Sequence, residues 1–365
     1  MVNLDINGRT VTVQEGQTVL QAARQAQINI PTLCDHPDLT PFGGCRLCVV
    51  DVKGQRLPVA ACTLLAEEGM QVQTESPRLV DARTSVLRLL LSSYYAEDFR
   101  ERDGRENELL RMAKKFHLDP QEYALQAPRF PIDSDPNPFI YVDMNRCILC
   151  KRCIRACAEV QGRFVWDLDG RGYKTQVVAG GGTTLLEARC ESCGACVAYC
   201  PTGALDHKLS RGLGKPSRVV STVCTYCGVG CSLDLHVKDD RKGSRVIRAA
   251  SNPSAPVNGM HLCVKGRYGY DFIHHPERLS RPRVREYLLT GQPRTGAERG
   301  PWVEVDWDTA LEITSRKLGE IRDAHGACSV GIMTSAKCTN EENYLMNKLA
   351  RQVIGTHNID HCARL

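Results

Sequence analysis

Residues 147–157 read CILCKRCIRAC, and residues 190–201 read CESCGACVAYCP. Both stretches place four cysteines at the spacing C-x2-C-x2-C-x3-C, and Pro201 follows the last cysteine of the second. Two-residue gaps can bring three thiolates to one side of a 4Fe–4S cubane, and in paired runs the fourth cysteine ligates the other cluster. The repeat therefore predicts two clusters, and it decides the fold of this part of the chain.

The crossed arrangement assigns the ligands of both predicted clusters. The first is expected to be bound by Cys147, Cys150, Cys153 and Cys200, and the second by Cys190, Cys193, Cys196 and Cys157. Two zinc sites are the alternative, because zinc also takes four thiolates, but zinc explains neither the proline nor the crossed repeat. On these motifs, residues 138–209 resemble a bacterial-type two-cluster ferredoxin, which implies a pseudo-symmetric 4Fe–4S domain.

Composition agrees with metal sites rather than disulfides. The 365 residues contain 19 cysteines, an odd number, and the N-terminus MVNLDINGRTV has no apolar segment typical of a signal peptide. No run of about 18 apolar residues indicates a membrane span. The net charge of +5 comes from interleaved basic and acidic residues and does not indicate nucleic-acid binding. We expect a cytoplasmic protein with no membrane span and no nucleic-acid partner.

Residues 1–78 are predicted to form a small sheet against one helix. Apolar residues alternate on both sides of Asn7–Gly8, a dipeptide typical of hairpin turns, and TVLQAARQAQI at 18–28 has helical spacing. Four further cysteines follow, at Cys34, Cys45, Cys48 and Cys62. Gly43 and Gly44 would let the loop wrap closely around a cluster. Four buried thiols are the alternative, because free cysteine is often found in cores.

This N-terminal region is similar to the 2Fe–2S domain that opens the large iron–sulfur subunit of NADH dehydrogenase and related formate dehydrogenases. The resemblance implies a β-grasp domain with one 2Fe–2S cluster on these four cysteines. Those relatives carry next a cluster site spaced H-x3-C-x2-C-x5-C, which here falls on Tyr94, Asp98, Glu101 and Asn107. None of these supplies a thiolate or an imidazole, so residues 79–137 are predicted to be a helical spacer and proline-rich linker without a cluster.

A fourth cysteine set lies further along the chain, at Cys224, Cys227, Cys231 and Cys263. On spacing alone this set suits zinc or a 4Fe–4S cluster. The sequence CTYCGVGC and NGMHLCVKGRYGYDF resembles the opening domain of molybdopterin oxidoreductases, above all formate dehydrogenases, over residues 217–272. That resemblance implies a third 4Fe–4S cluster, with Lys265 carrying electrons between this cluster and a pterin. The remaining Cys328, Cys338 and Cys362 are predicted to be ordinary thiols.

Residues 273–365 have the pattern of an α/β domain that has only begun. A helix is expected over 308–325, with Ala310, Ile313, Lys317/Leu318 and Ile321 on one face, and SVGIMTS at 329–335 and HNID at 357–360 are expected strands. Thr339 and Glu342 form a capping-box pattern before a helix that ends at Gly355. With no partners for its edges, this part is predicted to be poorly supported.

The segment from Thr334 to Leu365 resembles the formate dehydrogenase segment that leads into the catalytic residue. In that family a cysteine or selenocysteine bound to molybdenum or tungsten comes next, so the metal ligand is expected just after Leu365. The candidates for contact with a bis-molybdopterin guanine dinucleotide are Lys265, Lys337, Asn340 and Asn343. Lys337, Asn340 and Asn343 lie at a helix N-terminus that suits a pyrophosphate, and simple capping is the alternative.

The sequence thus predicts an α+β multidomain chain: the N-terminal portion of a cytoplasmic formate dehydrogenase catalytic subunit, inactive as these 365 residues alone. Formate would be oxidised to CO2, and the clusters would pass electrons to a flavin-bearing NAD(P)-reducing subunit, a ferredoxin or a hydrogenase module. The alternative is a non-catalytic iron–sulfur electron-transfer subunit of a diaphorase, hydrogenase or complex-I-like assembly.

Overall fold

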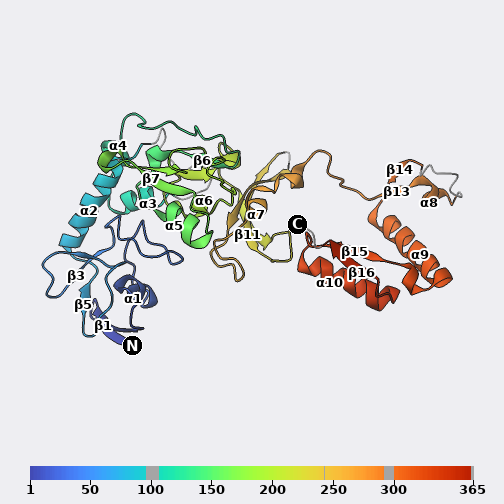
Figure 1. Cartoon of the computed structure of the whole chain (residues 1–365), viewed down its shortest axis with the longest axis horizontal. Helices are drawn as coiled ribbons and strands as arrows, with labels where there is room; N and C mark the ends of the chain where they lie inside the picture. Colours follow the sequence, from blue (N-terminus) through green and yellow to red (C-terminus); the bar gives the residue numbers. More distant parts are fainter. Residues whose placement is uncertain (96–106, 242, 292–299, 363–365) are drawn as a thin grey trace. The chain divides into compact units, whose positions relative to one another are not determined.

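A computed structural model describes residues 1–95, 107–241, 243–291 and 300–362 (Figure 1). The chain divides into two compact units, which are described separately below. The first comprises residues 1–219, 236–251 and 260–268, and the second comprises residues 220–235, 252–259 and 269–365. Within the described ranges, no helix is both long enough and apolar enough to cross a membrane.

The N-terminal domain is a five-stranded sheet in the order β2-β1-β5-β3-β4. Its strands are β1 (Val2–Ile6), β2 (Arg9–Val13), β3 (Val49–Val52), β4 (Val59–Ala60) and β5 (Gln71–Gln73). β1 pairs antiparallel with β2 through the predicted Asn7–Gly8 turn, where both residues have positive φ, and parallel with β5. Helix α1 (Val19–Gln25) begins at Thr18 with a capping box and packs its apolar face on this sheet.

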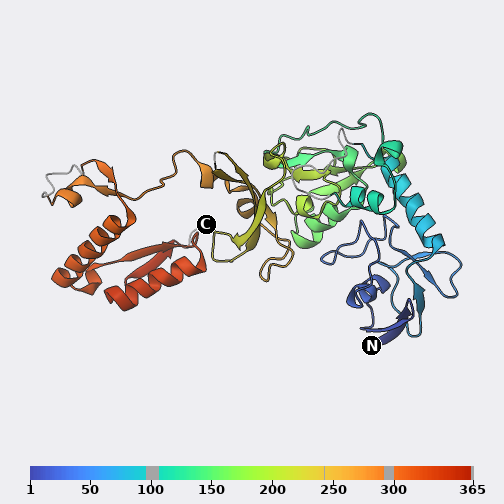
Figure 2. The ribbon, with the colours of Figure 1, turned by 180° about the vertical axis from the view of Figure 1, so that it is seen from behind.

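Three helices follow the sheet. They are α2 (Pro77–Ser92), α3 (Glu108–Lys115) and α4 (Pro120–Tyr123). Helix α2 begins at Ser76, whose hydroxyl accepts the amide hydrogen of Leu79, with Pro77 in the first turn. Figures 1 and 2 both show α2 running from the N-terminal sheet toward α4, and its Leu87 and Leu91 are fully buried.

The two cysteine runs lie in a compact region with two short antiparallel ribbons. One ribbon pairs β6 (Ile140–Val142) with β9 (Leu205–His207), and the other pairs β7 (Trp166–Asp169) with β8 (Gln176–Ala179). The first run continues into α5 (Arg152–Arg155) and a π-helical turn η2 (Ala156–Val160), and the second into α6 (Ala195–Tyr199). The short helices η1 (Met144–Arg146), η3 (Gly172–Lys174) and η4 (Lys208–Ser210) complete the region.

A three-stranded sheet of β10 (Arg218–Val223), β11 (Ser232–Asp240) and β12 (Gly243–Ser251) follows. Helix α7 (Val264–Tyr268) belongs to the first unit and contacts β12. It starts directly after Cys263. This places a buried face, Gly266 to Tyr268, one turn beyond a candidate cluster ligand.

The second unit contains two small two-stranded sheets. The antiparallel pair is β13 (Arg283–Arg285) with β14 (Trp302–Glu304), and the parallel pair is β15 (Ile332–Ser335) with β16 (Ile359–Cys362). The helices are η5 (Asp271–His274), α8 (Glu286–Thr290), α9 (Trp307–His325), η6 (Ala327–Ser329), α10 (Asn340–Lys348) and η7 (Leu349–Ile354). The parallel pair around α10 confirms the predicted strand–helix–strand unit, and Thr339 forms its capping box with Glu342.

The predicted apolar face of helix α9 is buried over only part of its length. Ala310 and Ile313 are buried, but Ile321 is 41% exposed. The small core of this unit contains Val330, Ile332, Ala350 and Ile354, and Leu318 is the residue of α9 that packs against it. The apolar face is therefore covered along only part of its length, because few other elements of the unit pack on it.

Candidate iron–sulfur sites

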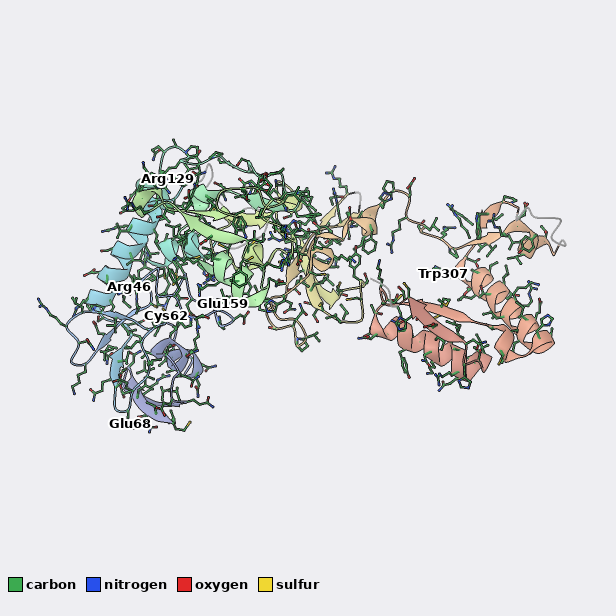
Figure 3. All side chains as sticks on the ribbon, in the orientation of Figure 1. Arg46, Cys62, Glu68, Arg129, Glu159 and Trp307 are labelled. Atoms are coloured by element: carbon green, nitrogen blue, oxygen red, sulfur yellow. The ribbon has the colours of Figure 1, made fainter. Side chains whose placement is uncertain are left out.

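The four N-terminal cysteines form a chain of close sulfur contacts. Cys34 hydrogen-bonds with Cys45 and Cys62, which lowers the pKa of Cys34 to about 2, and Cys62 also contacts Cys48. The amide of Cys45 donates to the Cys34 sulfur at 3.4 Å. All four side chains are buried. The structure thus brings the predicted set together, and Cys62 comes from the loop after β4 (Figure 3).

Close to this set, the loop geometry depends on residues in the left-handed conformation. Arg46, between Cys45 and Cys48, has φ of 60°, and Gly43 has φ of 70°. A Cβ on Gly43 would lie 3.0 Å from the Thr63 methyl group, so the glycine permits a close approach. A non-glycine residue in this conformation is costly and is a common feature of functional sites.

The two central runs repeat the same backbone conformation. Leu149 and Lys151 in the first run have φ of 53° and 56°, and Ser192 and Gly194 in the second have φ of 52° and 71°. This conformation turns amide hydrogens toward sulfur. The Leu149 amide donates to Cys147 at 3.4 Å, and the Ser192 amide donates to Cys190 at 3.3 Å. Amide donors to the sulfur ligands are a means by which proteins adjust cluster potentials.

Within each predicted crossed set, the cysteines affect one another's pKa values. Burial raises the pKa of Cys147 to about 12, and the thiol of Cys200 contributes in the same direction. Cys200 likewise raises the pKa values of Cys150 and Cys153, after burial in each case. In the second set, burial raises the pKa values of Cys190, Cys193 and Cys196, and Cys157 contributes to each.

These thiols fit clusters better than single ions. Within the described residues, no three Cys, His, Asp or Glu side chains are arranged around one metal ion. Zinc requires four ligands that converge tetrahedrally on one point, whereas each thiolate of a cubane binds its own iron. The four buried thiols of the N-terminal set, and the buried and half-buried thiols of the crossed sets with their amide donors, therefore fit iron–sulfur clusters. Such a cluster accepts or donates one electron at a time when bound.

Comparisons with known proteins agree with this geometry. Residues 1–77 match the 2Fe-2S iron-sulfur cluster binding domain, and residues 137–206 match the ferredoxin-like domain of NADH-quinone oxidoreductase subunit 3. Residues 217–275 match the molybdopterin oxidoreductase Fe4S4 domain, and residues 278–365 match the family described as molybdopterin oxidoreductase. Residues 217–365 therefore carry the two molybdopterin oxidoreductase domains, after the 2Fe-2S and ferredoxin-like domains. The order of these domains confirms the predicted fold class.

Similar proteins carry several names. The chain is 36% identical over its full length to NADPH-Fe(3+) oxidoreductase subunit alpha of Geobacter sulfurreducens, 33% to an NADH-quinone oxidoreductase subunit of Rhizobium meliloti, and 29% to the putative formate dehydrogenase YrhE of Bacillus subtilis. It spans about 40% of the length of each. A solved NAD+-reducing [NiFe]-hydrogenase chain is 31% identical, with 58% of this chain and 89% of that chain covered and a TM-score of 0.49.

The fourth cysteine set is divided between the two units. Cys224, Cys227 and Cys231 belong to the second unit, where the amide of Cys224 donates to the carbonyl of Cys231 at 2.8 Å. Cys263 and Lys265 belong to the first unit, and both side chains are exposed. The predicted roles of these residues remain predictions.

Apart from Lys265, three residues are predicted to contact the pterin, and they have different surroundings. The Asn340 side-chain amide donates to the carbonyl of Gly228 at 2.8 Å, so α10 is bonded to the loop between Cys227 and Cys231. Asn343 donates to the carbonyls of Ser335 and Thr339, which is a structural role within the turn. The Lys337 backbone amide donates to the Ser335 hydroxyl at 3.0 Å. Asn340 is therefore the residue of this group that reaches toward a candidate cluster loop.

Two of the four residues at the relatives' additional cluster position are joined directly. The Asn107 side-chain amide donates to the Tyr94 hydroxyl at 2.9 Å, and its oxygen accepts the amides that begin α3. Tyr94 is buried, and burial raises its pKa. Asp98 and Glu101 lie outside the described residues. A tyrosine–asparagine hydrogen bond thus links the two ends of the segment that is predicted to lack a cluster.

A buried histidine near the second run predicts a pH dependence. Burial lowers the pKa of His207 from 6.5 to about 3, and the Arg248 guanidinium acts in the same direction. In the folded state the His207 ring stays neutral down to about pH 3, whereas in the unfolded chain it takes up a proton as the pH falls through 6.5. Because protonation then favours the unfolded chain, the stability of the folded state decreases as the pH drops below 6.5. At pH 5 this effect lowers the free energy of unfolding by about 2 kcal/mol. Urea unfolding at pH 7.5 and at pH 5 measures this loss of stability. The loss should be smaller in His207→Gln than in the wild-type protein. An equal loss in both proteins would show that His207 is not its cause.

Proposed function

We propose that the chain is the electron-relay portion of a formate dehydrogenase catalytic subunit, which oxidises formate to CO2 at a molybdenum or tungsten pterin centre. The proposal is supported most directly by the crossed grouping of the eight central cysteines together with the bond between Asn340 and the Cys227–Cys231 loop. The crossed grouping would link one cluster site to the next. The Asn340 bond connects the Cys227–Cys231 loop to α10, the helix that would face the pterin.

The proposed cofactors follow from the donor sets. Cys34, Cys45, Cys48 and Cys62 would hold a 2Fe–2S cluster, and the two crossed sets would each hold a 4Fe–4S cluster. Cys224, Cys227, Cys231 and Cys263 would hold a third 4Fe–4S cluster, with Lys265 on the pterin side. The chain's own contribution is to bury the thiolates, fix their spacing and donate amide hydrogens to sulfur.

A second candidate function rests on the names of the relatives. The protein from Geobacter sulfurreducens is named an NADPH-Fe(3+) oxidoreductase subunit, and that from Rhizobium meliloti an NADH-quinone oxidoreductase subunit. A subunit that only carries electrons between a nicotinamide-linked partner and another acceptor would also need the cysteine sets. In both cases we propose a partner that exchanges electrons with NAD(P)H, a ferredoxin or a hydrogenase.

Reduction by defined donors separates the two functions. The protein, produced in its native host and purified without oxygen, is mixed with formate or with NADPH, and the clusters are followed by EPR spectroscopy. Reduction by formate alone supports the dehydrogenase. Reduction by NADPH in the presence of the partner, with no response to formate, supports the relay subunit instead. Iron content well below about fourteen atoms per chain would contradict the cluster assignment itself.

A further inference from the structure

The two cysteine runs share the spacing of their ligands and their backbone conformation, but at three positions between the ligands the side chains differ in both size and positive charge. These positions hold Lys151, Arg152 and Arg155 in the first run and Gly194, Ala195 and Ala198 in the second. Each is occupied by a basic side chain in one run and by a small residue in the other. A repeat that only bound two clusters would need no such difference, so the contacts made from these positions are informative.

In the first run, the basic residues contact the loop that carries the N-terminal cysteines. One end of the Arg155 guanidinium donates to the carbonyls of Cys34 and Cys150, the second at 3.3 Å, and its other end donates to the carbonyl of Thr40. Arg152 donates to the carbonyl of Asp35 at 2.8 Å. One turn further on, the Glu159 carboxylate accepts the Thr40 amide at 2.8 Å (Figure 3). Arg155 therefore bonds to a candidate ligand of each of two clusters.

In the second run, the small residues leave room for a cation from another segment. A Cβ on Gly194 would lie 2.3 Å from Cδ of Arg267 and 2.5 Å from the hydroxyl of Tyr268. The space is filled by Arg267, whose Nε donates to the carbonyl of Cys193 at 2.9 Å. Arg267 lies in α7, and its amide donates to the carbonyl of Cys263 at 3.1 Å. Arg267 therefore also bonds to candidate ligands of two different clusters.

Arg155 and Arg267 share a second property, which concerns their charge. Two buried arginines of the first unit have carboxylate partners: Arg152 pairs with Glu108 at 2.8 Å, and Arg248 pairs with Asp206 at 3.1 Å. A third, Arg83, donates to the carbonyls of Val49 and Thr74, and Arg155 itself is half-buried. Among the described residues, neither Arg155 nor Arg267 has a carboxylate within ion-pair distance, and their acceptors are carbonyl and hydroxyl oxygens.

The absence of a carboxylate matters because Arg267 is only 3% exposed. A buried cation without a counter-charge is strongly unfavourable. A cluster held by four thiolates is an anion, so it would supply the missing negative charge.

We propose that Arg155 and Arg267 are positioning residues that set the reduction potentials of the two central clusters and bind each cluster site to the next. This inference rests on the proposed iron–sulfur relay. The reduced form of a cluster carries one more negative charge than the oxidised form, so a buried cation beside it favours reduction. Net charge near the cluster is an established determinant of its potential.

The test compares neutral and charged replacements in the anaerobically purified protein. Arg267→Gln removes the charge and keeps a hydrogen-bond donor, whereas Arg267→Lys keeps the charge. Redox titration followed by EPR should show that Arg267→Gln makes the second central cluster at least tenfold harder to reduce, about 59 mV for one electron. The 2Fe–2S potential should not change. Arg155→Gln should act instead on the first central cluster and the 2Fe–2S cluster.

Controls separate charge from folding. Arg9→Gln, at the exposed first position of β2, should leave every potential unchanged. Wild-type potentials in both Arg155→Gln and Arg267→Gln, with iron retained, would overturn the inference. If Arg267→Gln loses its cluster, Arg267→Lys decides: a wild-type potential supports the role of charge, and loss of the same cluster makes Arg267 purely structural. Wild-type protein without cluster signals would instead overturn the proposed function.

Discussion

Replacing Cys157 with alanine is expected to abolish the 4Fe–4S cluster of the second cysteine run, although Cys157 belongs to the first run. Its thiol contributes to the raised pKa values of Cys190, Cys193 and Cys196, which burial raises most. A cubane that loses one of its four thiolates has an iron atom without a protein ligand. We therefore expect loss of the EPR signal of that intact cluster and of up to about four irons per chain.

The reciprocal variant makes the prediction specific. Cys200→Ala should abolish the cluster bound by Cys147, Cys150 and Cys153 and leave the other in place. Cys328→Ala is the matched control, because Cys328 is an exposed cysteine outside all four sets. The crossed assignment would be wrong if Cys157→Ala and Cys147→Ala abolished the same signal, since both residues would then serve one cluster.

The crossed grouping could be predicted because it depends on local spacing. Gaps of two residues hold three thiolates within one loop, and only the fourth cysteine, three residues further on, is left to reach the neighbouring cluster. The Asn7–Gly8 hairpin and the Thr339–Glu342 capping box were predictable for the same reason. Each depends on residues at most three positions apart, whose conformations are limited by φ preference and by side-chain hydrogen bonds to the backbone.

The backbone conformation at the clusters could not be predicted in this way. Leu149, Lys151 and Ser192 have positive φ, although none is glycine or asparagine. Residue preference alone argues against this conformation, which costs about 1–2 kcal/mol per residue. It is stabilised here by amide–sulfur hydrogen bonds. A functional requirement therefore overrides the local preference, as is common at strained sites.

The roles of Arg155 and Arg267, which connect neighbouring cluster sites, were not predicted because their hydrogen-bond partners are distant in sequence. Arg155 bonds to Cys34, 121 positions away, and Arg267 bonds to Cys193, 74 positions away. One signal was available: the sequence KRCIR at 151–155 is basic where GACVA at 194–198 is small. A position-by-position comparison of the two halves of the repeat would have drawn attention to the basic residues of the first run and to the space beside the small residues of the second.

Replacing Asp206 with asparagine is expected to destabilise the first unit by about 3–5 kcal/mol, the cost of breaking a buried ion pair. Asp206 in β9 accepts a hydrogen bond from Arg248 in β12 at 3.1 Å, and their side chains are only 10% and 8% exposed. Arg248 also lowers the pKa of Arg267, although burial is the larger cause. Without the carboxylate, two guanidinium groups and His207 would share a buried region with less negative charge to balance them.

An exposed ion pair provides the matched control. Asp239 pairs with Arg218 at 3.3 Å, with the side chains 42% and 51% exposed, so Asp239→Asn should lower the stability far less than Asp206→Asn. Urea unfolding without oxygen at pH 7.5 measures both variants. The double variant Asp206→Leu/Arg248→Met should recover much of the lost stability, because it leaves no unpaired charge. Equal losses in Asp206→Asn and Asp239→Asn would show that burial of the pair does not determine its contribution.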